Sequence, residues 1–282
     1  MRLILASLML PMTALAAAPQ RIVSTAPSFT ETLYAVGAGD RVVAVSTYCH
    51  YPTVVDKLPR VGSYLQPNVE VIARLKPDLV LVHAEQKQAV AQLTGLGIRV
   101  LALRNTSLDD TLRSMREIGE AAGLPERGAA LEAKTRAGLA ALRNRSEGQQ
   151  QKSLLFIVGR TPGRLDGIIA VGKGSFLNEL IGIAGGRNVL SDSPVTYPRI
   201  SIEAIIRMAP DVIVDMGDMA VTVGVTDEHK RSVVKLWDAQ PGIRAVANKR
   251  VFAVAADIFV VPGPRVIEAA EAFASMLRGS GQ

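Results

Sequence analysis

The stretch Val69-Glu70-Val71-Ile72-Ala73-Arg74-Leu75-Lys76-Pro77-Asp78-Leu79-Val80-Leu81-Val82 decides the fold, because it has a second copy, Ile202-Glu203-Ala204-Ile205-Ile206-Arg207-Met208-Ala209-Pro210-Asp211-Val212-Ile213-Val214-Asp215. Each copy predicts a short helix, a Pro-Asp turn and a buried strand, since proline ends a helix and the following apolar run is short and rich in β-formers. A repeat on this scale predicts two similar lobes. The identical pairs are Glu70 and Glu203, Ile72 and Ile205, Arg74 and Arg207, Pro77 and Pro210, and Asp78 and Asp211.

The composition is that of a globular protein large enough for two domains. The chain has 282 residues, of which 48% are hydrophobic, so it can form two cores. Its formal net charge is +6, but the Lys and Arg residues are scattered singly. That pattern is typical of a solvated surface and not of a nucleic-acid groove. We therefore expect no nucleic-acid partner.

The N-terminus predicts a secretory signal peptide. Arg2 supplies the positive charge, residues 3–15 are mostly apolar, and small residues at Ala14, Ala16 and Ala18 form cleavage sites. The apolar stretch is too short for a membrane span. The only cysteine, Cys49, lies far beyond the expected cleavage site, so we expect no lipid attached to a cysteine at the new N-terminus. The sequence therefore predicts cleavage near residues 16–18 and a soluble, exported, periplasmic protein.

Strands and helices alternate on both sides of a long helical stretch. Residues 21–24 predict a strand, and the next helix has Ser28 as its expected N-cap with Glu31 at the capping-box position. A second series begins at residue 154, and its segment 174–180 resembles the start of that first helix. Such alternation predicts mostly parallel sheets with helices on their faces.

The helical stretch between the two series has two possible interpretations. Helical periodicity runs from residue 109 to 122, pauses at Gly123-Leu124-Pro125, and resumes to about Arg145. It is either a surface helix of the first lobe or a connector, and we favour the connector because a second series follows directly. The expected α/β fold is two Rossmann-like lobes joined by one long helix, with a ligand cleft between them. The expected parts are a signal peptide (1–18), an N-terminal lobe (19–124), a connecting helix (125–150) and a C-terminal lobe (151–282).

The sequence contains no convincing catalytic motif. Gly172-Lys173-Gly174-Ser175 resembles the end of a phosphate-binding loop but lacks the preceding glycine spacing and the Lys-Ser/Thr pair. The three histidines, His50, His83 and His229, are not spaced as zinc ligands. We therefore expect a binding protein without catalytic cofactor and not an enzyme.

Aromatic and polar residues gather at the expected carboxyl ends of strands, which is the ligand-binding edge of α/β sheets. Two lobes that face each other across this edge would enclose a cleft. Tyrosine offers a flat apolar face with a polar tip, which suits a large planar ligand. Any one of these residues alone could be simple packing. The candidate ligand contacts are Tyr48, Tyr51, Tyr64, His83, Arg160, Tyr197 and Phe259.

Glu70 and Glu203 begin the two copies of the repeat. A carboxylate in the first helical turn is favoured by the helix dipole, which would be a sufficient explanation for a single copy. Two copies at equivalent places on two lobes also suit docking on a partner with two matching arginine patches.

The sequence resembles class III periplasmic substrate-binding proteins of ABC importers for vitamin B12, iron-siderophores and haem. The resemblance extends through most of the chain after residue 18. It rests on Arg21-Ile22-Val23-Ser24 with Ser28-x-Thr30-Glu31, Tyr48-x-x-Tyr51-Pro52, residues 62–70 with Lys76-Pro77-Asp78-Leu79-Val80, Tyr197-Pro198-x-x-Ser201-x-Glu203, and Pro262-Gly263-Pro264-Arg265.

The resemblance implies a monomer with two lobes joined by one long helix, which changes little on binding. It implies that Glu70 and Glu203 form salt bridges with arginines of a dimeric permease in the inner membrane. The pattern is most similar to the cobalamin-binding branch, in which Tyr48, Tyr64 and Tyr197 would contact the corrin. His83 and Ile258 depart from that branch, where tryptophan can occur.

Two other functions stay open at this stage. His83 could ligate cobalt or haem iron, and Arg160 could pair with the carboxylates of haem or a siderophore, so haem and ferric siderophores are alternative ligands. A different class is an exported enzyme or metal-binding protein that uses Cys49, His50 and His83. A lobe that senses a ligand for a signalling partner is a third possibility.

Overall fold

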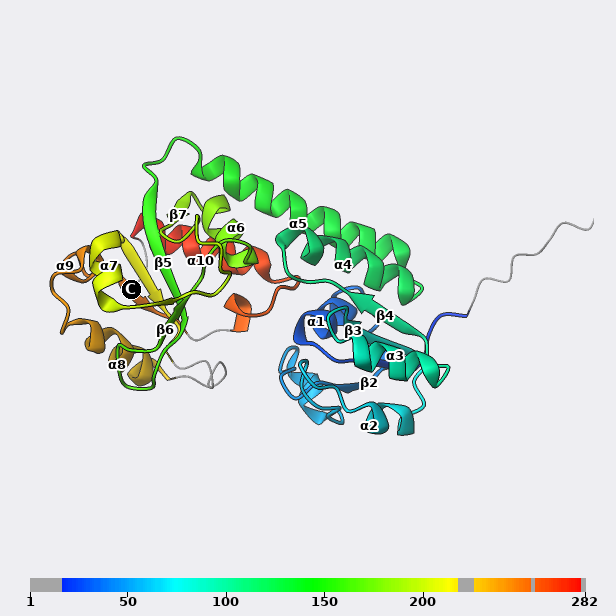
Figure 1. The fold of residues 1–282 in the computed structure, drawn as a ribbon. Coiled ribbons are helices and arrows are strands. Elements are labelled where there is room, and N and C mark those ends of the chain that lie inside the picture. Colours follow the sequence, from blue (N-terminus) through cyan, green and yellow to red (C-terminus); the bar gives the residue numbers. More distant parts are fainter. Residues whose placement is uncertain (1–16, 218–225, 255–256, 280–282) are drawn as a thin grey trace, which may run out of the picture.

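The computed structural model describes residues 17–217, 226–254 and 257–279, so the expected signal peptide lies almost wholly outside the described residues. Two sheets flanked by helices form two lobes, and helix α5 (Pro125–Ser146) extends along both of them (Figure 1). This confirms the predicted α/β fold with two lobes and a long connecting helix.

The N-terminal lobe contains a fully parallel sheet in the order β2-β1-β3-β4. Its strands are β1 (Ile22–Ser24), β2 (Val42–Val45), β3 (Leu79–His83) and β4 (Val100–Leu103). Its helices are α1 (Pro27–Ala35), α2 (Val69–Arg74) and α3 (Lys87–Gly95), with 3-10 turns η1 (Gly39–Arg41) and η2 (Thr53–Lys57).

The C-terminal lobe contains a mixed sheet in the order β10-β9-β5-β6-β8, with β7 also paired to β5. The pairs of β5 with β7 and β9, and of β9 with β10, are parallel, whereas β6 is antiparallel to both its neighbours. The strands are β5 (Lys152–Gly159), β6 (Ile168–Ala170), β7 (Gly186–Asn188), β8 (Arg199–Ile200), β9 (Val212–Asp215) and β10 (Val251–Ala253). The helices are α6 (Phe176–Ile183), α7 (Ile202–Met208), α8 (Asp227–Trp237), α9 (Arg244–Ala247), α10 (Val266–Arg278) and the 3-10 turn η3 (Asp257–Phe259).

The two copies of the repeat fold alike, as helix α2 before β3 and helix α7 before β9. A side-chain oxygen caps each helix, Asn68 on α2 and Ser201 on α7. Lys76 and Ala209, which precede the two prolines, both have positive φ, at 48° and 43°. A residue before proline is disfavoured in the right-handed helical region, so neither helix continues to its proline: α2 ends at Arg74 and α7 at Met208.

The aspartate after each proline ties its strand to the first strand of its lobe. The carboxylate of Asp78 accepts hydrogen bonds from the backbone N–H of Arg21 (2.9 Å) and of Gln20 (2.7 Å), just before β1. The carboxylate of Asp211 accepts from the backbone N–H of Ser153 (2.8 Å), at the start of β5. The repeated Pro-Asp therefore aligns the two central strands of each sheet.

Helix α4 (Leu108–Ala121), which the sequence assigned to the first lobe alone, contributes to both cores. Leu112 and Met115 belong to the core of the C-terminal lobe, whereas Ile118 belongs to that of the N-terminal lobe. Antiparallel α4 and α5 meet closely at their shared turn, where a Cβ on Gly119 would lie 2.5 Å from the Cα of Gly128. The lobes are thus bridged by a helical pair.

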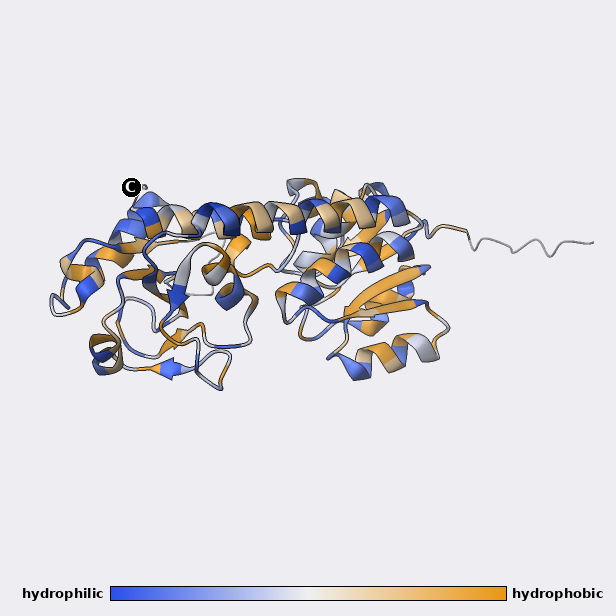
Figure 2. Cartoon of the chain, turned by 90° about the horizontal axis from the view of Figure 1, so that it is seen from above, coloured by the Kyte–Doolittle hydropathy of each residue, from blue (hydrophilic) through white to orange (hydrophobic). Residues whose placement is uncertain are grey.

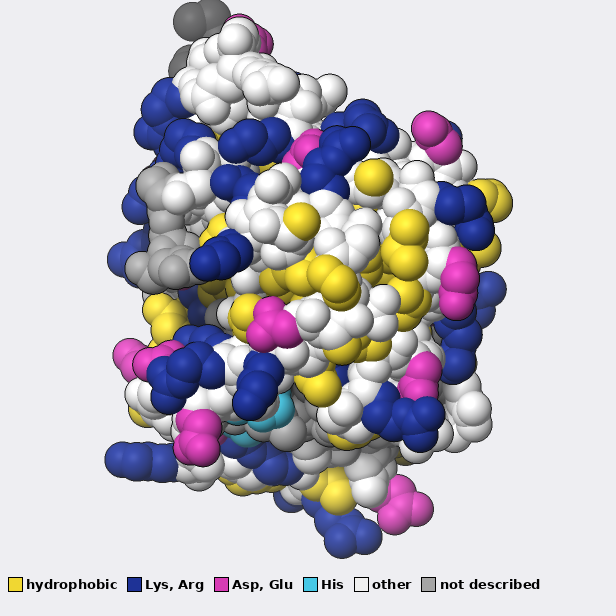
Figure 3. Space-filling model, turned by 90° about the vertical axis from the view of Figure 1, so that its left-hand side faces the viewer, with side chains coloured by type: hydrophobic (Ala, Val, Ile, Leu, Met, Phe, Trp, Pro, Cys, Tyr) yellow, Lys and Arg dark blue, Asp and Glu magenta, His cyan; other side chains and the backbone are white. Residues whose placement is uncertain are grey.

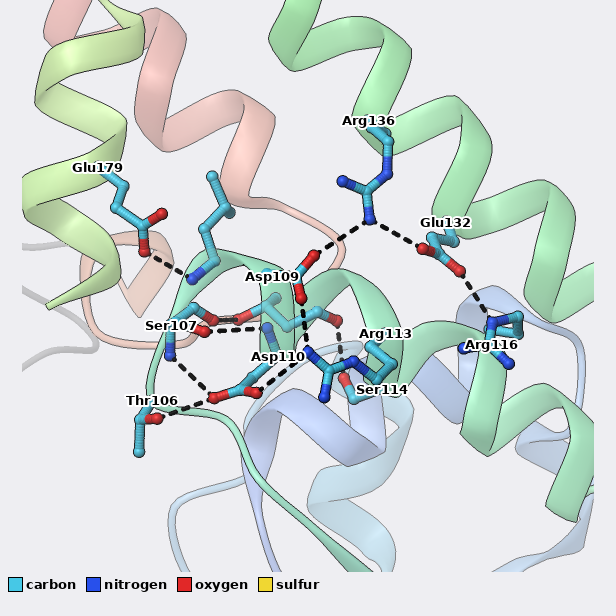
Figure 4. A network of polar contacts seen from close by, with 12 residues as sticks. Thr106, Ser107, Asp109, Asp110, Arg113, Ser114, Arg116, Glu132, Arg136 and Glu179 are labelled. Carbon is cyan, nitrogen blue, oxygen red and sulfur yellow. Dashed lines mark hydrogen bonds and ion pairs between the residues drawn. The ribbon is translucent and has the colours of Figure 1, made fainter. Parts of the chain in front are cut away.

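Polar contacts fix this helical pair at its exposed edge (Figure 4). Asp109 on α4 pairs with Arg136 on α5 (3.4 Å), and Arg136 also pairs with Glu132 (3.0 Å). The backbone N–H of Leu108 donates to Glu179 of α6 (2.8 Å), which ties the start of α4 to the C-terminal lobe. Each exposed pair contributes little by itself, so the buried side chains provide most of the stability.

The distribution of hydrophobic residues differs between the strands and the long helix α5. Strands of the N-terminal lobe are hydrophobic along their length, whereas α5 alternates between hydrophobic and hydrophilic residues (Figure 2). Its buried side includes Leu139 and Leu142, and Gly138 lies against Ile267 of α10. Within the described part of the chain, no helix has the length and apolar character needed to cross a membrane.

The end of the C-terminal lobe carries both signs of charge. On the face shown in Figure 3, many Lys and Arg side chains are spread around the surface, several of them next to one another in the upper part, with acidic, apolar and neutral side chains elsewhere.

Candidate ligand-binding site

An aromatic cluster lies at the carboxyl edge of the N-terminal sheet. The Tyr64 ring is 5.6 Å from that of Tyr48 and 6.1 Å from that of His83, both in edge-to-face geometry. His83, the last residue of β3, also lies 4.7 Å from the buried ring of Phe29. Tyr48 is 57% exposed and Tyr64 38%, so the cluster keeps free aromatic faces.

A tight loop brings Tyr64 into this cluster. Gly62 and Pro67 form a bridge that closes the loop, and the backbone N–H of Gln66 donates to the Ser63 hydroxyl (3.0 Å). Gly62 has a φ of 90°, and a Cβ there would lie 2.6 Å from the Gln66 carbonyl oxygen. Only glycine fits this position without strain, and Tyr64 consequently sits at the loop tip.

Tyr197 lies in the C-terminal lobe, just before β8. Its hydroxyl lies 3.4 Å from that of Ser175, the N-cap of α6, and its side chain is 46% exposed. Burial raises the pKa of Tyr64, and the neighbouring Tyr48 and Tyr197 raise it further. Ring contacts therefore join three of the predicted contacts, Tyr48, Tyr64 and His83, whereas Tyr197 influences Tyr64 electrostatically from the other lobe.

Tyr51 has a different environment, at a polar seam between the lobes. The guanidinium of Arg265 lies 4.1 Å from the centre of the Tyr51 ring. Arg265 donates two hydrogen bonds to each of two carboxylates, Glu31 of the N-terminal lobe and Asp257 of the C-terminal lobe. Nearby, Asn105 donates to the carbonyl of Pro262 across the same seam (2.9 Å).

The sequence did not predict the seam. Glu31 was expected in a capping box with Ser28, but α1 begins at Pro27 without a side-chain cap, and Glu31 pairs with Arg265. The two residues are separated by 234 positions, so no local pattern links them. The only signal in the sequence was the motif Pro262-Gly263-Pro264-Arg265, which carried the family resemblance but gave no indication of a pairing with Glu31.

Arg160 and Phe259 depart from the expected ligand contacts. The Arg160 side chain is buried, and its Nε donates to Asp215 (2.9 Å), which also accepts from the indole N–H of Trp237 (2.8 Å). Phe259 is 2% exposed and packs against Phe156 and Phe273. The buried guanidinium of Arg160 is already paired with Asp215, and the ring of Phe259 is part of the core. We therefore leave both residues out of the site.

Cys49, His50 and His83 do not assemble as a metal site. The Cys49 thiol is buried, 3.2 Å from the Thr30 hydroxyl, and burial raises its pKa. His50 is exposed and lies 3.2 Å from Asp56. Among the residues that the structure describes, no three His, Cys, Asp or Glu side chains are grouped to hold a metal ion.

Glu70 and Glu203 occupy equivalent exposed positions. Each is the second residue of its helix, α2 or α7, and precedes an arginine by four positions. The Glu70 side chain is 84% exposed and lies 3.6 Å from Arg74. The hydroxyl of Ser201 lowers the pKa of Glu203 through a hydrogen bond. Both carboxylates are therefore open to a partner.

Two hollows have linings that contain none of the residues of the aromatic cluster. One, of about 620 Å³, lies beside Glu70 between the start of α2 and the end of α3, where Leu96 is exposed. The other, of about 600 Å³, lies between α5 and α10. Neither includes a predicted ligand contact, so the expected cleft between the lobes stays a proposal.

The class of protein follows from comparison with known sequences. Residues 22–258 match the family model described as periplasmic binding protein. The chain belongs to the periplasmic binding protein family.

Within this family, the chain is similar to several individual proteins and solved structures. The chain is 31% identical to the vitamin B12-binding protein of Vibrio cholerae serotype O1, over 92% of this chain and 89% of the relative. It is 33% identical to the uncharacterized ABC transporter substrate-binding lipoprotein YvrC of Bacillus subtilis, over 92% and 80%. Among solved structures, it resembles periplasmic vitamin B12 binding protein BtuF of Vibrio cholerae (TM-score 0.78, 29% identity, 93% and 98% covered). It also resembles the periplasmic heme-binding protein RhuT of Roseiflexus sp. RS-1 (TM-score 0.77, 26% identity, 93% and 99% covered).

Proposed function

We propose that this protein is a periplasmic substrate-binding protein that captures a corrinoid such as vitamin B12 and delivers it to an ABC importer. The observation that carries the proposal is the set of exposed tyrosines, Tyr48, Tyr64 and Tyr197, contributed by both lobes. Flat aromatic faces on two sides suit a large, mostly planar ring system. The vitamin B12-binding relatives, at about 31% identity over most of both chains, support a corrinoid.

In the proposed complex the tyrosines provide apolar contact, and the ligand leaves chemically unchanged. Binding, release and partner recognition are then the whole function, so we propose no catalytic role. Arg265, held by Glu31 and Asp257, keeps the lobes at one separation and supports the Tyr51 ring. A preformed site of this kind loses little conformational freedom on binding.

The partner that we propose is the permease dimer of an ABC importer in the inner membrane. Glu70 and Glu203 offer one exposed carboxylate on each lobe, which suits two arginine patches on a twofold partner. We propose that the binding protein acts as a monomer in the periplasm.

Haem is the second candidate ligand, favoured by the resemblance to the heme-binding protein RhuT. Equilibrium dialysis of the purified protein against cyanocobalamin and against haemin tests the choice. Stoichiometric retention of cyanocobalamin supports the proposal. Retention of haemin without cyanocobalamin would replace it with a haem carrier.

A further inference from the structure

His83 is a polar side chain in the aromatic cluster whose role is not explained by packing alone. It ends β3, and its ring lies between the buried Phe29 and the half-exposed Tyr64. His83 is only partly buried, so its ring nitrogens could bond either to a group of the protein, such as a backbone carbonyl or a carboxylate, or to a molecule outside it.

The ring nitrogens of His83 have no such partner. Within residues 17–217, 226–254 and 257–279, no hydrogen bond joins either nitrogen to another group. In the same residues, Arg250 Nε is the only buried side-chain nitrogen or oxygen without a partner. The nitrogens of His83 are therefore not sealed in the core and are accessible from outside the protein.

The protonation state of His83 suits a metal ligand. Burial lowers its pKa and the nearby Glu85 opposes this only in part, so the imidazole is neutral at neutral pH and keeps a free lone pair. Phe29, on α1, adds no charge, and Tyr64, on its loop, has a raised pKa and stays a neutral phenol. Of these groups, His83 is the one that offers nitrogen to a metal, and neutral imidazole is the commonest metal ligand in proteins.

We propose, building on the corrinoid function, that His83 binds the ligand's cobalt as an axial ligand and so selects corrinoids with an exchangeable axial position. With the ring system against the tyrosines, the lone pair of one His83 nitrogen forms a bond to cobalt(III), and the water held there leaves with its own electron pair. No electron is transferred. Tyr64 and Phe29 flank the imidazole and restrict its rotation.

The test compares two forms of one corrinoid. Aquacobalamin carries a replaceable water on cobalt, whereas cyanocobalamin carries a tightly held cyanide. The untagged protein should shift the visible absorption bands of aquacobalamin to longer wavelength and leave the bands of cyanocobalamin in place. His83→Phe, which retains an aromatic ring, should abolish the shift and lower the affinity ratio of aquacobalamin to cyanocobalamin at least about tenfold.

His50→Phe is the matched control, because His50 is exposed, pairs with Asp56 and lies outside the cluster. It should retain the spectral shift. Binding of both cobalamins by the unaltered protein without a shift, or with a shift that survives His83→Phe, would overturn the inference and leave the proposed function intact. Failure to bind either cobalamin would overturn both.

Discussion

The side chain of Arg265, at the start of α10, joins Glu31 of α1, with Nε 3.0 Å from Oε2. This ion pair links two lobes whose sheets share no strand. Asp257 holds the other side of the guanidinium, and the ring of Tyr51 lies against its face. Because the planar guanidinium is held on two edges and one face, the contact constrains both the distance and the angle between the lobes.

The first prediction concerns this seam. Glu31→Gln removes the charge of a buried carboxylate while Arg265 and Asp257 remain, so we expect the free energy of unfolding to fall by about 3 kcal/mol. Urea denaturation followed by circular dichroism measures the change. The exposed Glu147→Gln is the control and should lie close to the unaltered protein. An equally small effect of Glu31→Gln would show that the seam does not stabilise the fold.

Tyr64 and Tyr197 should contribute to affinity and not to stability. Both are partly exposed, so Tyr64→Ala and Tyr197→Ala should leave the melting temperature nearly unchanged while each weakens cyanocobalamin binding about tenfold or more. Tyr→Phe at the same positions keeps the ring and should retain most of the affinity. Unaltered binding in both alanine variants would move the site elsewhere.

Phe259 should show the opposite behaviour. Its ring is buried against Phe156 and Phe273, so Phe259→Ala leaves a cavity and should cost about 3–5 kcal/mol of stability. The fraction of the variant that remains folded should bind cyanocobalamin as the unaltered protein does. Denaturation and calorimetric titration of the same sample separate the two effects, and selective loss of affinity would return Phe259 to the site.

The pH dependence of stability should carry a contribution from His83. Its pKa in the folded protein is lowered from the ordinary value of about 6.5, so between these two pKa values the unfolded chain binds more protons. The free energy of unfolding should therefore rise with pH in that window and level off above it. Comparing His83→Phe with the unaltered protein isolates the effect, because the variant lacks the group. Parallel curves for the two proteins would contradict the pKa direction.

Glu70 and Glu203 should matter for delivery and not for capture. Their carboxylates are exposed on α2 and α7, and no hydrogen bond in the described part of the chain joins them to the tyrosines, so Glu70→Ala combined with Glu203→Ala should bind cyanocobalamin normally. Uptake of labelled cobalamin by cells that depend on this protein should be lost, because the proposed arginine contacts are missing. Normal uptake by the double variant would refute the docking role.

The parts of the fold that the sequence predicted are those written in local patterns. The repeat around Pro77 and Pro210 predicted two helix-turn-strand units, and both are present with matching left-handed turns. The connecting helix, expected at 125–150, runs from Pro125 to Ser146. Each prediction depended on residues close together in the chain, where periodicity and turn chemistry are reliable.

The candidate site was predictable only in part, because it depends on which residues meet across long separations. Tyr48 and Tyr64 follow or flank strands and could be placed at the sheet edge. Nothing local distinguishes Phe259 from Ile258, yet Phe259 is fully buried in the core whereas Ile258, one step away in the 3-10 turn, stays partly exposed at its edge. The sequence likewise suggested Arg160 as a ligand contact, because its ion-pair partner Asp215 is 55 positions away and no local pattern links the two.

The most direct test of the central claim is a calorimetric titration of the purified protein with cyanocobalamin, haemin and a ferric siderophore under identical conditions. Calorimetry is preferable to intrinsic fluorescence, since Trp237 is buried in the C-terminal lobe and bonded to Asp215. The account predicts saturable, one-to-one binding of cyanocobalamin at about micromolar concentration or below, corresponding to about 8 kcal/mol or more of binding free energy. Saturation by haemin or the siderophore alone would contradict it.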